Sequence, residues 1–297
     1  MGRDVYELPP RRLPPEQAGV TRRSLLRLGP TRQARRDIDY VVITERVRSA
    51  WESHAPDSLL RALEPAAEAI VRLAGVGPGA RVADVGAGDG NVAVLCAARG
   101  AEVTACDLAP GIVERGRARC GRDIQWTVAD AQSLPFAGGS FDAVLSAFGT
   151  ALAPRWDQAA RELCRVVRPG GLVIVTGWVP RGLPGGLFEI AQDLDPLPEA
   201  VPTPAEWGRQ EVVRARLEPL LEGLELRTRS VRLRFRDEDD AFAALCVWTA
   251  LEPEQLAALR PQFDRLLASC NNSVAGVEID ARYLIALGRR PPSGDRA

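Results

Sequence analysis

Five short apolar segments that alternate with helical segments constrain the fold of this 297-residue chain more than any other feature. The apolar segments are residues 81–86, 101–107, 124–130, 141–149 and 171–178. Helical spacing of apolar residues fills the intervals at 91–99, 111–120 and 155–167, and RPGG at 168–171 predicts a turn. Alternating strands and helices predict a parallel sheet that is covered by helices on both faces.

The flanking sequence divides the chain into further regions. Residues 1–37 carry nine arginines and four acidic residues together with clustered prolines, which predicts an extended arm. Helical patterns at 37–54 and 56–74 predict helices before the sheet. After residue 178 the expected elements are helices at 204–221, 237–251 and 253–269 and strands at 224–235 and 281–288. The predicted division is therefore 1–37, 38–77, 78–178, 179–290 and a tail at 291–297.

Composition places the chain among soluble globular proteins. Hydrophobic residues make up 46% of the sequence, and the formal net charge is −1. No apolar run approaches the ~20 residues of a membrane span, and the N-terminus lacks the apolar core of a secretory signal. The six cysteines form no C-x-x-C pair, which favours reduced thiols over zinc ligands or disulfides. These features predict a cytoplasmic protein.

Lysine is absent, so all 38 basic residues are arginines. This excludes Schiff-base chemistry and general bases that depend on lysine. It also excludes a Walker loop, because that motif needs a lysine on the phosphates.

A glycine-rich loop follows the first apolar segment in the sequence VADVGAGDGN, residues 82–91. Asp84 precedes Gly86, Gly88 and Gly90 at alternate positions. A dinucleotide-binding loop would place its third glycine where Asn91 stands, so that motif is incomplete. A plain turn between strand and helix is the alternative interpretation.

Acidic residues end three successive predicted strands. Asp84 is followed by Asp107, seventeen residues past Gly90, and by Asp130. A carboxylate at the second position can accept both hydroxyls of a ribose, although Asp107 could instead cap the next helix. The third carboxylate can accept an adenine amino group while the amide of Ala131 donates to a ring nitrogen. The carboxyl edge of a parallel sheet is where ligands bind in open α/β folds.

In this order, VADVGAGDGN, VTACDLAP, VADAQSLPFAGGSFDAVLSAFG and LCRVVRPGGLVIVTGW resemble the class I S-adenosylmethionine-dependent methyltransferases. The resemblance covers residues 78–178 and is closest to the small-molecule branch, including quinone-biosynthesis and natural-product enzymes. It implies a doubly wound α/β fold with a mostly parallel, seven-stranded, Rossmann-like sheet. It also implies N-terminal helices over the active site, a small helical insertion near the C-terminal strands and an antiparallel last strand at 281–288.

The resemblance implies which residues bind the cofactor S-adenosylmethionine. They are Asp84, Gly86, Gly88, Gly90, Asp107, Leu108, Asp130, Ala131 and Ser146. Asp84 would orient the loop and the cofactor amino group, and Gly86 and Gly88 would approach the methionine portion. Asp107 would hold the ribose and Asp130 the adenine, whereas Ser146 to Phe148 would border the transferable methyl group.

The acceptor is predicted to be a small molecule. SAFG at 146–149 replaces the N-P-P-Y-like segment of many enzymes that methylate nucleic-acid bases, and residues 38–297 are acidic overall. Neither nucleic acid nor a membrane is an expected partner, and the chain is expected to be a monomer or homodimer. Asp157 alone is no magnesium site, so no metal is expected.

His54 is the single histidine and the candidate general base for a hydroxyl or carbon acceptor. An exposed residue at a helix end is the alternative. Tyr40, Trp51, Phe148 and Trp178 are candidates for an aromatic acceptor pocket, as are Trp156 and Trp248, with core packing as the alternative for each.

The predicted function is methyl transfer to a small molecule of specialised metabolism, on oxygen or carbon rather than nitrogen. Two alternatives stay open: a methyltransferase that modifies peptides or proteins, and a family member that does not methylate, such as a cyclase or a cofactor-binding protein.

Overall fold

The computed structural model describes residues 38–54 and 56–292, without the side chains of Ser53 and His54. The predicted arm at 1–37 lies outside the described residues, as does most of the predicted tail. The described residues from Asp39 onward belong to one compact unit. Among these residues, no helix is both long enough and apolar enough to cross a membrane.

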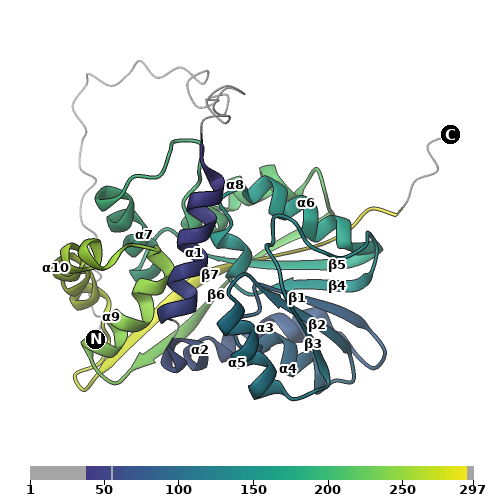
Figure 1. Cartoon of the computed structure of the whole chain (residues 1–297), viewed down its shortest axis with the longest axis horizontal. Helices are drawn as coiled ribbons and strands as arrows, with labels where there is room; N and C mark the ends of the chain where they lie inside the picture. The colour runs from purple at the N-terminus through teal and green to yellow at the C-terminus, as the bar shows by residue number, and fades with distance from the viewer. Residues whose placement is uncertain (1–37, 55, 293–297) are drawn as a thin grey trace, which may run out of the picture. The chain divides into compact units, whose positions relative to one another are not determined.

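The elements follow the predicted alternation, and Figure 1 labels most of them. The strands are β1 (Arg81–Val85), β2 (Glu102–Asp107), β3 (Ile124–Val128), β4 (Phe141–Ser146), β5 (Val167–Trp178), β6 (Glu222–Phe235) and β7 (Val277–Arg289). The α-helices are α1 (Tyr40–His54), α2 (Asp57–Ala62), α3 (Glu64–Ala74), α4 (Asn91–Ala97), α5 (Pro110–Cys120), α6 (Trp156–Val166), α7 (Leu183–Leu194), α8 (Gln210–Leu217), α9 (Glu238–Cys246) and α10 (Pro253–Cys270). Short 3₁₀ helices are η2 (Gly149–Leu152), η3 (Pro204–Gly208) and η4 (Val247–Thr249).

The seven strands form one sheet in the order β3-β2-β1-β4-β5-β7-β6. Strands β1 to β5 pair in parallel, and β7 runs antiparallel between β5 and β6. The predicted α/β fold with a mostly parallel sheet of seven strands and an antiparallel last strand is confirmed. The strand order reverses between β1 and β4, and ligands in such folds bind at the carboxyl edge of this reversal point.

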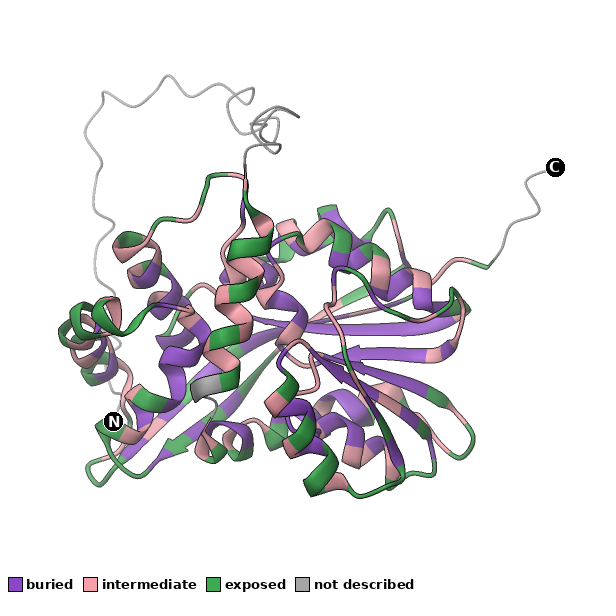
Figure 2. Cartoon of the chain, viewed as in Figure 1, coloured by how far each residue is buried: buried purple, intermediate pink, exposed green. Residues whose placement is uncertain are grey.

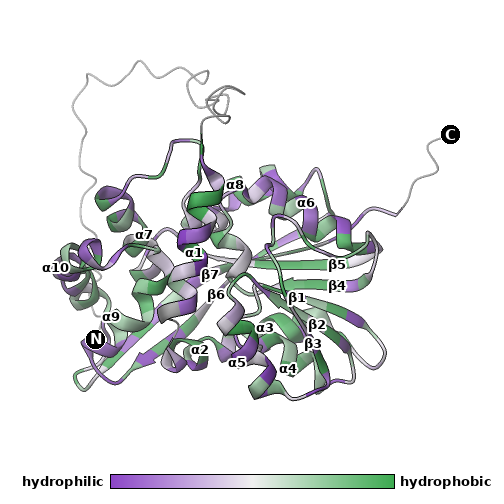
Figure 3. Ribbon diagram, viewed as in Figure 1, coloured by the Kyte–Doolittle hydropathy of each residue, from purple (hydrophilic) through white to green (hydrophobic). Residues whose placement is uncertain are grey.

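The central strands β1, β4 and β5 are largely buried on both faces, which explains why they are mainly apolar, whereas the edge strand β6 alternates exposed arginines with buried apolar residues (Figures 2 and 3). Along β5, Leu172 and Ile174 belong to one hydrophobic core, whereas Val173 and Val175 belong to the other. This alternation follows from the two-residue period of a strand. Helices α3 and α4 cover the first face, and α6 and α8 cover the second.

Several predicted boundaries were wrong. The helix expected at 204–221 is η3 followed by α8, because the backbone of Arg209 between them is extended, with φ −90° and ψ 116°. The helix expected at 56–74 is split into α2 and α3, because Pro65 in the first turn of α3 has no N–H to continue the preceding helix. The turn expected at 168–171 belongs to β5, which pairs with the end of β7. There the amide of Gly170 donates to the carbonyl of Arg290 at 2.8 Å, and the amide of Arg290 donates to the carbonyl of Gly171 at 3.0 Å.

Helix α7 was not predicted, because two prolines and three glycines between residues 180 and 186 indicated a loop. Its glycines serve close packing. A Cβ at Gly185 would lie 2.0 Å from the carbonyl oxygen of Pro180, and one at Gly186 would lie 3.0 Å from the side chain of Leu266 in α10. Packing against α10 therefore overrides the low helix propensity of this segment.

Candidate functional site

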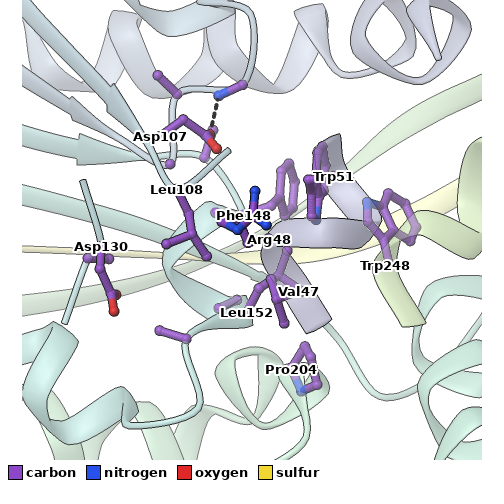
Figure 4. A pocket seen from close by; sticks show the side chains of 18 of the residues that line it. Val47, Arg48, Trp51, Asp107, Leu108, Asp130, Phe148, Leu152, Pro204 and Trp248 are labelled. Carbon is purple, nitrogen blue, oxygen red and sulfur yellow. Dashed lines mark hydrogen bonds between the residues drawn. The ribbon is translucent and has the colours of Figure 1, made fainter. Parts of the chain in front are cut away.

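A cavity of about 1130 Å³ opens at the carboxyl ends of the parallel strands. Loops after β1, β2, β3 and β4 form one end, which contains Asp107 and Asp130. Helix α1, η2 and side chains from α7, η3 and η4 form the other end (Figure 4). We call these the cofactor end and the acceptor end. The cavity therefore joins segments that lie between residues 44 and 248 of the chain.

The glycine loop forms the floor of the cofactor end. Gly86 has φ 66°, and a Cβ at this position would lie 2.7 Å from the Cα of Gly149. The loops after β1 and β4 consequently touch backbone to backbone, which only glycine permits at these positions. Gly88 also lines the cavity, whereas Gly90 does not. Gly90 has φ 99° at the start of α4 and packs against Trp126, so its contribution is to the turn.

Asp84 lies below the loop and does not line the cavity. Its carboxylate is 1% exposed, and Oδ2 accepts the amide of Ala93 in α4 at 3.0 Å. Its Oδ1 has no hydrogen-bond partner in the structure. Burial raises the pKa of Asp84 to about 8, because the low-dielectric surroundings disfavour the charged form. The residue ties β1 to α4, and its predicted contact with the cofactor stays a prediction.

Asp107 borders the cavity at the end of β2, next to Leu108, which also lines it. Its Oδ2 accepts the amide of Gly88 at 2.9 Å, shown as a dashed line in Figure 4, and its Oδ1 accepts the amide of Ala109 at 3.1 Å. Burial raises the pKa of Asp107 to about 6, against the opposing effect of these amides. Each oxygen keeps acceptor capacity for a second donor.

Asp130 and Ala131 line the cavity beyond the end of β3. Gln132, which sequence reasoning missed, connects this acid to other parts of the site. Its Nε2 donates to both carboxylate oxygens of Asp130, at 3.0 and 2.9 Å, and to Oγ1 of Thr44 in α1 at 3.2 Å. Its Oε1 accepts the amide of Arg155 at 2.9 Å. A buried glutamine thus links the third strand-end loop to α1 and to the start of α6.

Ser146 does not border the cavity. Its hydroxyl is fully buried, donates to the carbonyl of Val85 at 2.7 Å and lies 2.6 Å from Oγ1 of Thr150. It therefore fastens the end of β4 to β1 and to η2. Gly149 forms the nearby wall of the cavity instead. The sequence shows only that a polar residue ends an apolar strand, and this pattern does not tell whether its hydroxyl is buried or faces a cavity.

Aromatic rings from distant segments form one wall of the acceptor end. Phe148 adopts φ 66°, which is unusual for a bulky side chain, and its ring stacks on Trp178 with centroids 4.1 Å apart. The ring of Trp178 in turn packs against the ring of Trp248, with centroids 5.1 Å apart. Trp51 and Phe188 complete the wall, so the predicted Trp51, Phe148 and Trp178 all line the cavity. Phe188 was not predicted because it lies in helix α7, which was itself not predicted.

Two other predicted aromatics lie elsewhere. Tyr40 is not part of the cavity wall, and its ring lies under the guanidinium of Arg155 at 5.3 Å. Trp156 packs edge-on against Trp207 at 6.3 Å on the opposite face of the sheet. Both were placed in the pocket by residue type alone, which carries no information about the face they occupy.

Helix α1 covers both ends of the cavity. Its residues Thr44, Val47, Arg48 and Trp51 line the cavity at helical spacing. Next in the helix, both carboxylate oxygens of Glu52 accept the amide of Gly111 in α5, at 2.9 and 3.0 Å. His54 is the last residue of α1, but its side chain lies outside the described residues, so its predicted role as a base stays a prediction.

Charges are distributed unevenly along the cavity. Among the described lining residues, the carboxylates are Asp107 and Asp130, both at the cofactor end, and the cation is Arg48 at the acceptor end. Nε of Arg48 donates to Glu45 at 2.8 Å on the outer side of α1. Figure 4 labels Arg48 among the side chains that line the cavity. Sequence reasoning missed Arg48 because an arginine within a charged helix predicts a solvent-exposed side chain.

Comparison with known proteins identifies the domain. Residues 83–175 match the family described as the methyltransferase domain. An uncharacterized protein of Mycobacterium tuberculosis is 41% identical over 155 residues, covering 51% of this chain and 57% of that protein. A demethylmenaquinone methyltransferase of Beutenbergia cavernae is 38% identical over 132 residues, covering 43% of this chain and 54% of that enzyme. The chain thus spans little more than half the length of these curated relatives.

A solved structure shows the same fold at low sequence identity. Phosphoethanolamine N-methyltransferase 2 of Haemonchus contortus, in complex with phosphomonomethylethanolamine and S-adenosylhomocysteine, superposes with a TM-score of 0.51. The two sequences are 17% identical, and the match covers 76% of this chain and 52% of that one. This likeness concerns the fold alone.

Proposed function

We propose that this chain, which carries a class I S-adenosylmethionine-dependent methyltransferase domain, transfers a methyl group to oxygen or carbon of a small-molecule acceptor of specialised metabolism. The single observation that carries the proposal is the cavity itself. It joins a glycine floor and two strand-end carboxylates at one end to an apolar aromatic wall at the other.

The residues at the cofactor end fit S-adenosylmethionine. Asp107 offers two partly buried carboxylate oxygens to a ribose diol, and Asp130 and the amide of Ala131 can pair with the edge of an adenine. The side-chain-free floor at Gly86, Gly88 and Gly149 leaves room for the methionine portion. When bound, the cofactor supplies an electrophilic methyl group together with its own leaving group.

The chain's own residues then position the acceptor and exclude water. Displacement needs the nucleophile in line with the breaking bond at about 3 to 3.5 Å, so orientation supplies much of the rate enhancement. Stacking of Phe148 on Trp178 fixes a flat wall against which a planar acceptor can lie. Helix α1 contributes Val47 and Trp51 to the closure of the acceptor end.

The charge at the acceptor end supports oxygen or carbon as the acceptor atom. A cationic amine would find no lining carboxylate at this end among the described residues, because Glu45 lies outside the cavity and is already paired with Arg48. An anionic or hydrogen-bond-accepting oxygen would instead gain a guanidinium donor. His54 remains the candidate base, and if it acts so, His54→Ala should lower kcat by about 10²–10⁴ while cofactor affinity is retained.

The proposal is tested with purified full-length protein and S-adenosylmethionine labelled in its methyl group. Two panels of equal size, one of phenols and enols and one of primary and secondary amines, are screened for labelled product by mass spectrometry. We expect label in the first panel. Label only in the amines would contradict the proposed acceptor atom. Tight binding of S-adenosylhomocysteine without any labelled product would favour the non-methylating alternative.

A further inference from the structure

A second cavity of about 660 Å³ adjoins the acceptor end. The two cavities share wall residues, among them Val47, Leu152, Phe188, Pro204 and Trp248. Figure 4 labels four of these side chains, from α1, η2, η3 and η4. Because the same side chains border both spaces, the second cavity lies directly beside the acceptor end.

The second cavity has a mainly apolar wall that includes one ion pair. Ile43, Leu197, Val201 and Leu251 contribute to its wall. In this wall Arg46 of α1 pairs with Asp195, which follows α7, and each side chain is 28% exposed. Nη2 of Arg46 also lies 3.4 Å from the carbonyl of Ala250, which it can donate to. An apolar group in this cavity would thus border a closed ion pair.

The first cavity already contains both the cofactor end and the aromatic wall of the acceptor end, so the second cavity is additional to both. An acceptor limited to a single ring would leave the second cavity without an occupant.

We infer that the acceptor carries an apolar chain, and that this chain runs from the aromatic wall between Val47 and Leu152 into the second cavity. The head group lies against Phe148 and Trp178, and the chain leaves the ion pair of Arg46 and Asp195 closed. The inference rests on the proposed function and narrows its substrate class to molecules with a planar head and a linear, uncharged, hydrocarbon-like tail.

The test is calorimetry of 4-ethylphenol, 4-butylphenol and 4-hexylphenol with full-length protein saturated with S-adenosylhomocysteine. Burying each additional methylene should tighten binding about fourfold, from about 0.8 kcal/mol per group. Thr203 lines only the second cavity, so Thr203→Trp should abolish this dependence on chain length, whereas the matched Thr203→Val should retain it. Ala191→Leu provides a second, smaller obstruction of the same cavity.

Equal affinity for all three phenols in the wild-type protein would overturn the inference. So would an unchanged dependence on chain length in Thr203→Trp and Ala191→Leu variants that bind S-adenosylhomocysteine normally. The proposed function fails separately, by the absence of labelled product from phenols and enols in the methyl-transfer screen or by loss of S-adenosylhomocysteine binding in the wild-type protein, both of which are measured without any alkylphenol of this series.

Discussion

The two ends of the cavity are built in different ways. The cofactor end comes from four consecutive strand-end loops, and its polar groups are held by backbone amides close in sequence, such as those of Gly88 and Ala109 on Asp107. The acceptor end is assembled from helix α1, η2, α7, η3 and η4, which are up to about 200 residues apart. The comparison teaches that one end is fixed by local sequence and the other by tertiary packing.

The two ends also differ in electrostatics. Burial raises the pKa of both Asp84 and Asp107, so the cofactor end holds carboxylates at a free-energy cost in the ligand-free protein. The acceptor end instead presents aromatic surface and a guanidinium that already has a partner in Glu45. A ligand therefore improves the environment of charged groups at one end and mainly covers apolar surface at the other.

The largest expected effect is at the cofactor end. Asp107→Ala should weaken S-adenosylhomocysteine binding by about 10²–10⁴-fold, because two hydroxyls lose a charged acceptor that contributes about 1.5–3 kcal/mol for each bond. In the wild-type protein, affinity should fall as the pH drops through about 6, where the carboxylate becomes protonated. Calorimetry between pH 5 and 8 measures both effects. Asp107→Asn is the matched control for charge, and unchanged affinity in the alanine variant would remove the ribose assignment.

Arg48→Gln addresses the acceptor end alone. It should raise the KM of a phenol or enol acceptor by about 10- to 100-fold, as expected for the loss of a charged hydrogen bond. The dissociation constant of S-adenosylhomocysteine should stay the same. Arg48→Lys keeps the charge but loses the planar donor geometry, so its KM for the acceptor should lie between those of the wild type and Arg48→Gln. A matching loss of cofactor affinity in Arg48→Gln would show that the two ends are not separable at this residue.

Asp84→Asn tests the electrostatic cost of the cofactor end. The folded-state pKa of about 8 lies above the ordinary value of 3.8, so the folded protein retains a proton that the unfolded chain has lost. Stability should therefore fall as the pH rises from about 4 to about 8, with a contribution of about 1.4 kcal/mol per pH unit. Asparagine cannot ionise, and it keeps an acceptor for Ala93. Urea unfolding across this range should show a flatter pH dependence in the variant, and an identical slope would refute the assignment.

The smallest effect is expected where α1 joins the two ends. Thr44→Val removes the hydroxyl that accepts from Gln132 but keeps the shape of the side chain. The loss of one hydrogen bond should cost about 0.5–1.5 kcal/mol, visible as about 2- to 10-fold weaker binding of S-adenosylhomocysteine. Thr44→Ser retains the hydroxyl and should bind as the wild type does. Equal affinity of the valine variant would mean that Gln132 holds Asp130 without help from α1.

The difference between the ends also explains what could be predicted from sequence. Apolar segments ending in Asp84, Asp107 and Asp130 locate three strand ends, and parallel strands bring such ends to one edge. By contrast, Phe188 and Arg48 reach the cavity through the packing of α7 and α1, which their local sequences do not encode. Ser146 shows the limit even within the core, because its position at a strand end did not reveal that its hydroxyl faces Val85 and Thr150.

The contact between Gly86 and Gly149 has a consequence for how the cavity responds to ligands. Glycines in a binding loop are usually associated with mobility, but here the missing side chains let two backbones meet, at a spacing that a single methyl group would disrupt. The amide protons of Gly86 and Ala87 are moreover bonded to the carbonyl of Cys106, at 2.9 and 3.0 Å. In hydrogen–deuterium exchange these amides should be protected already in the free protein, so that slowing of exchange upon ligand binding concentrates in α1, the half-exposed cover, rather than in the floor.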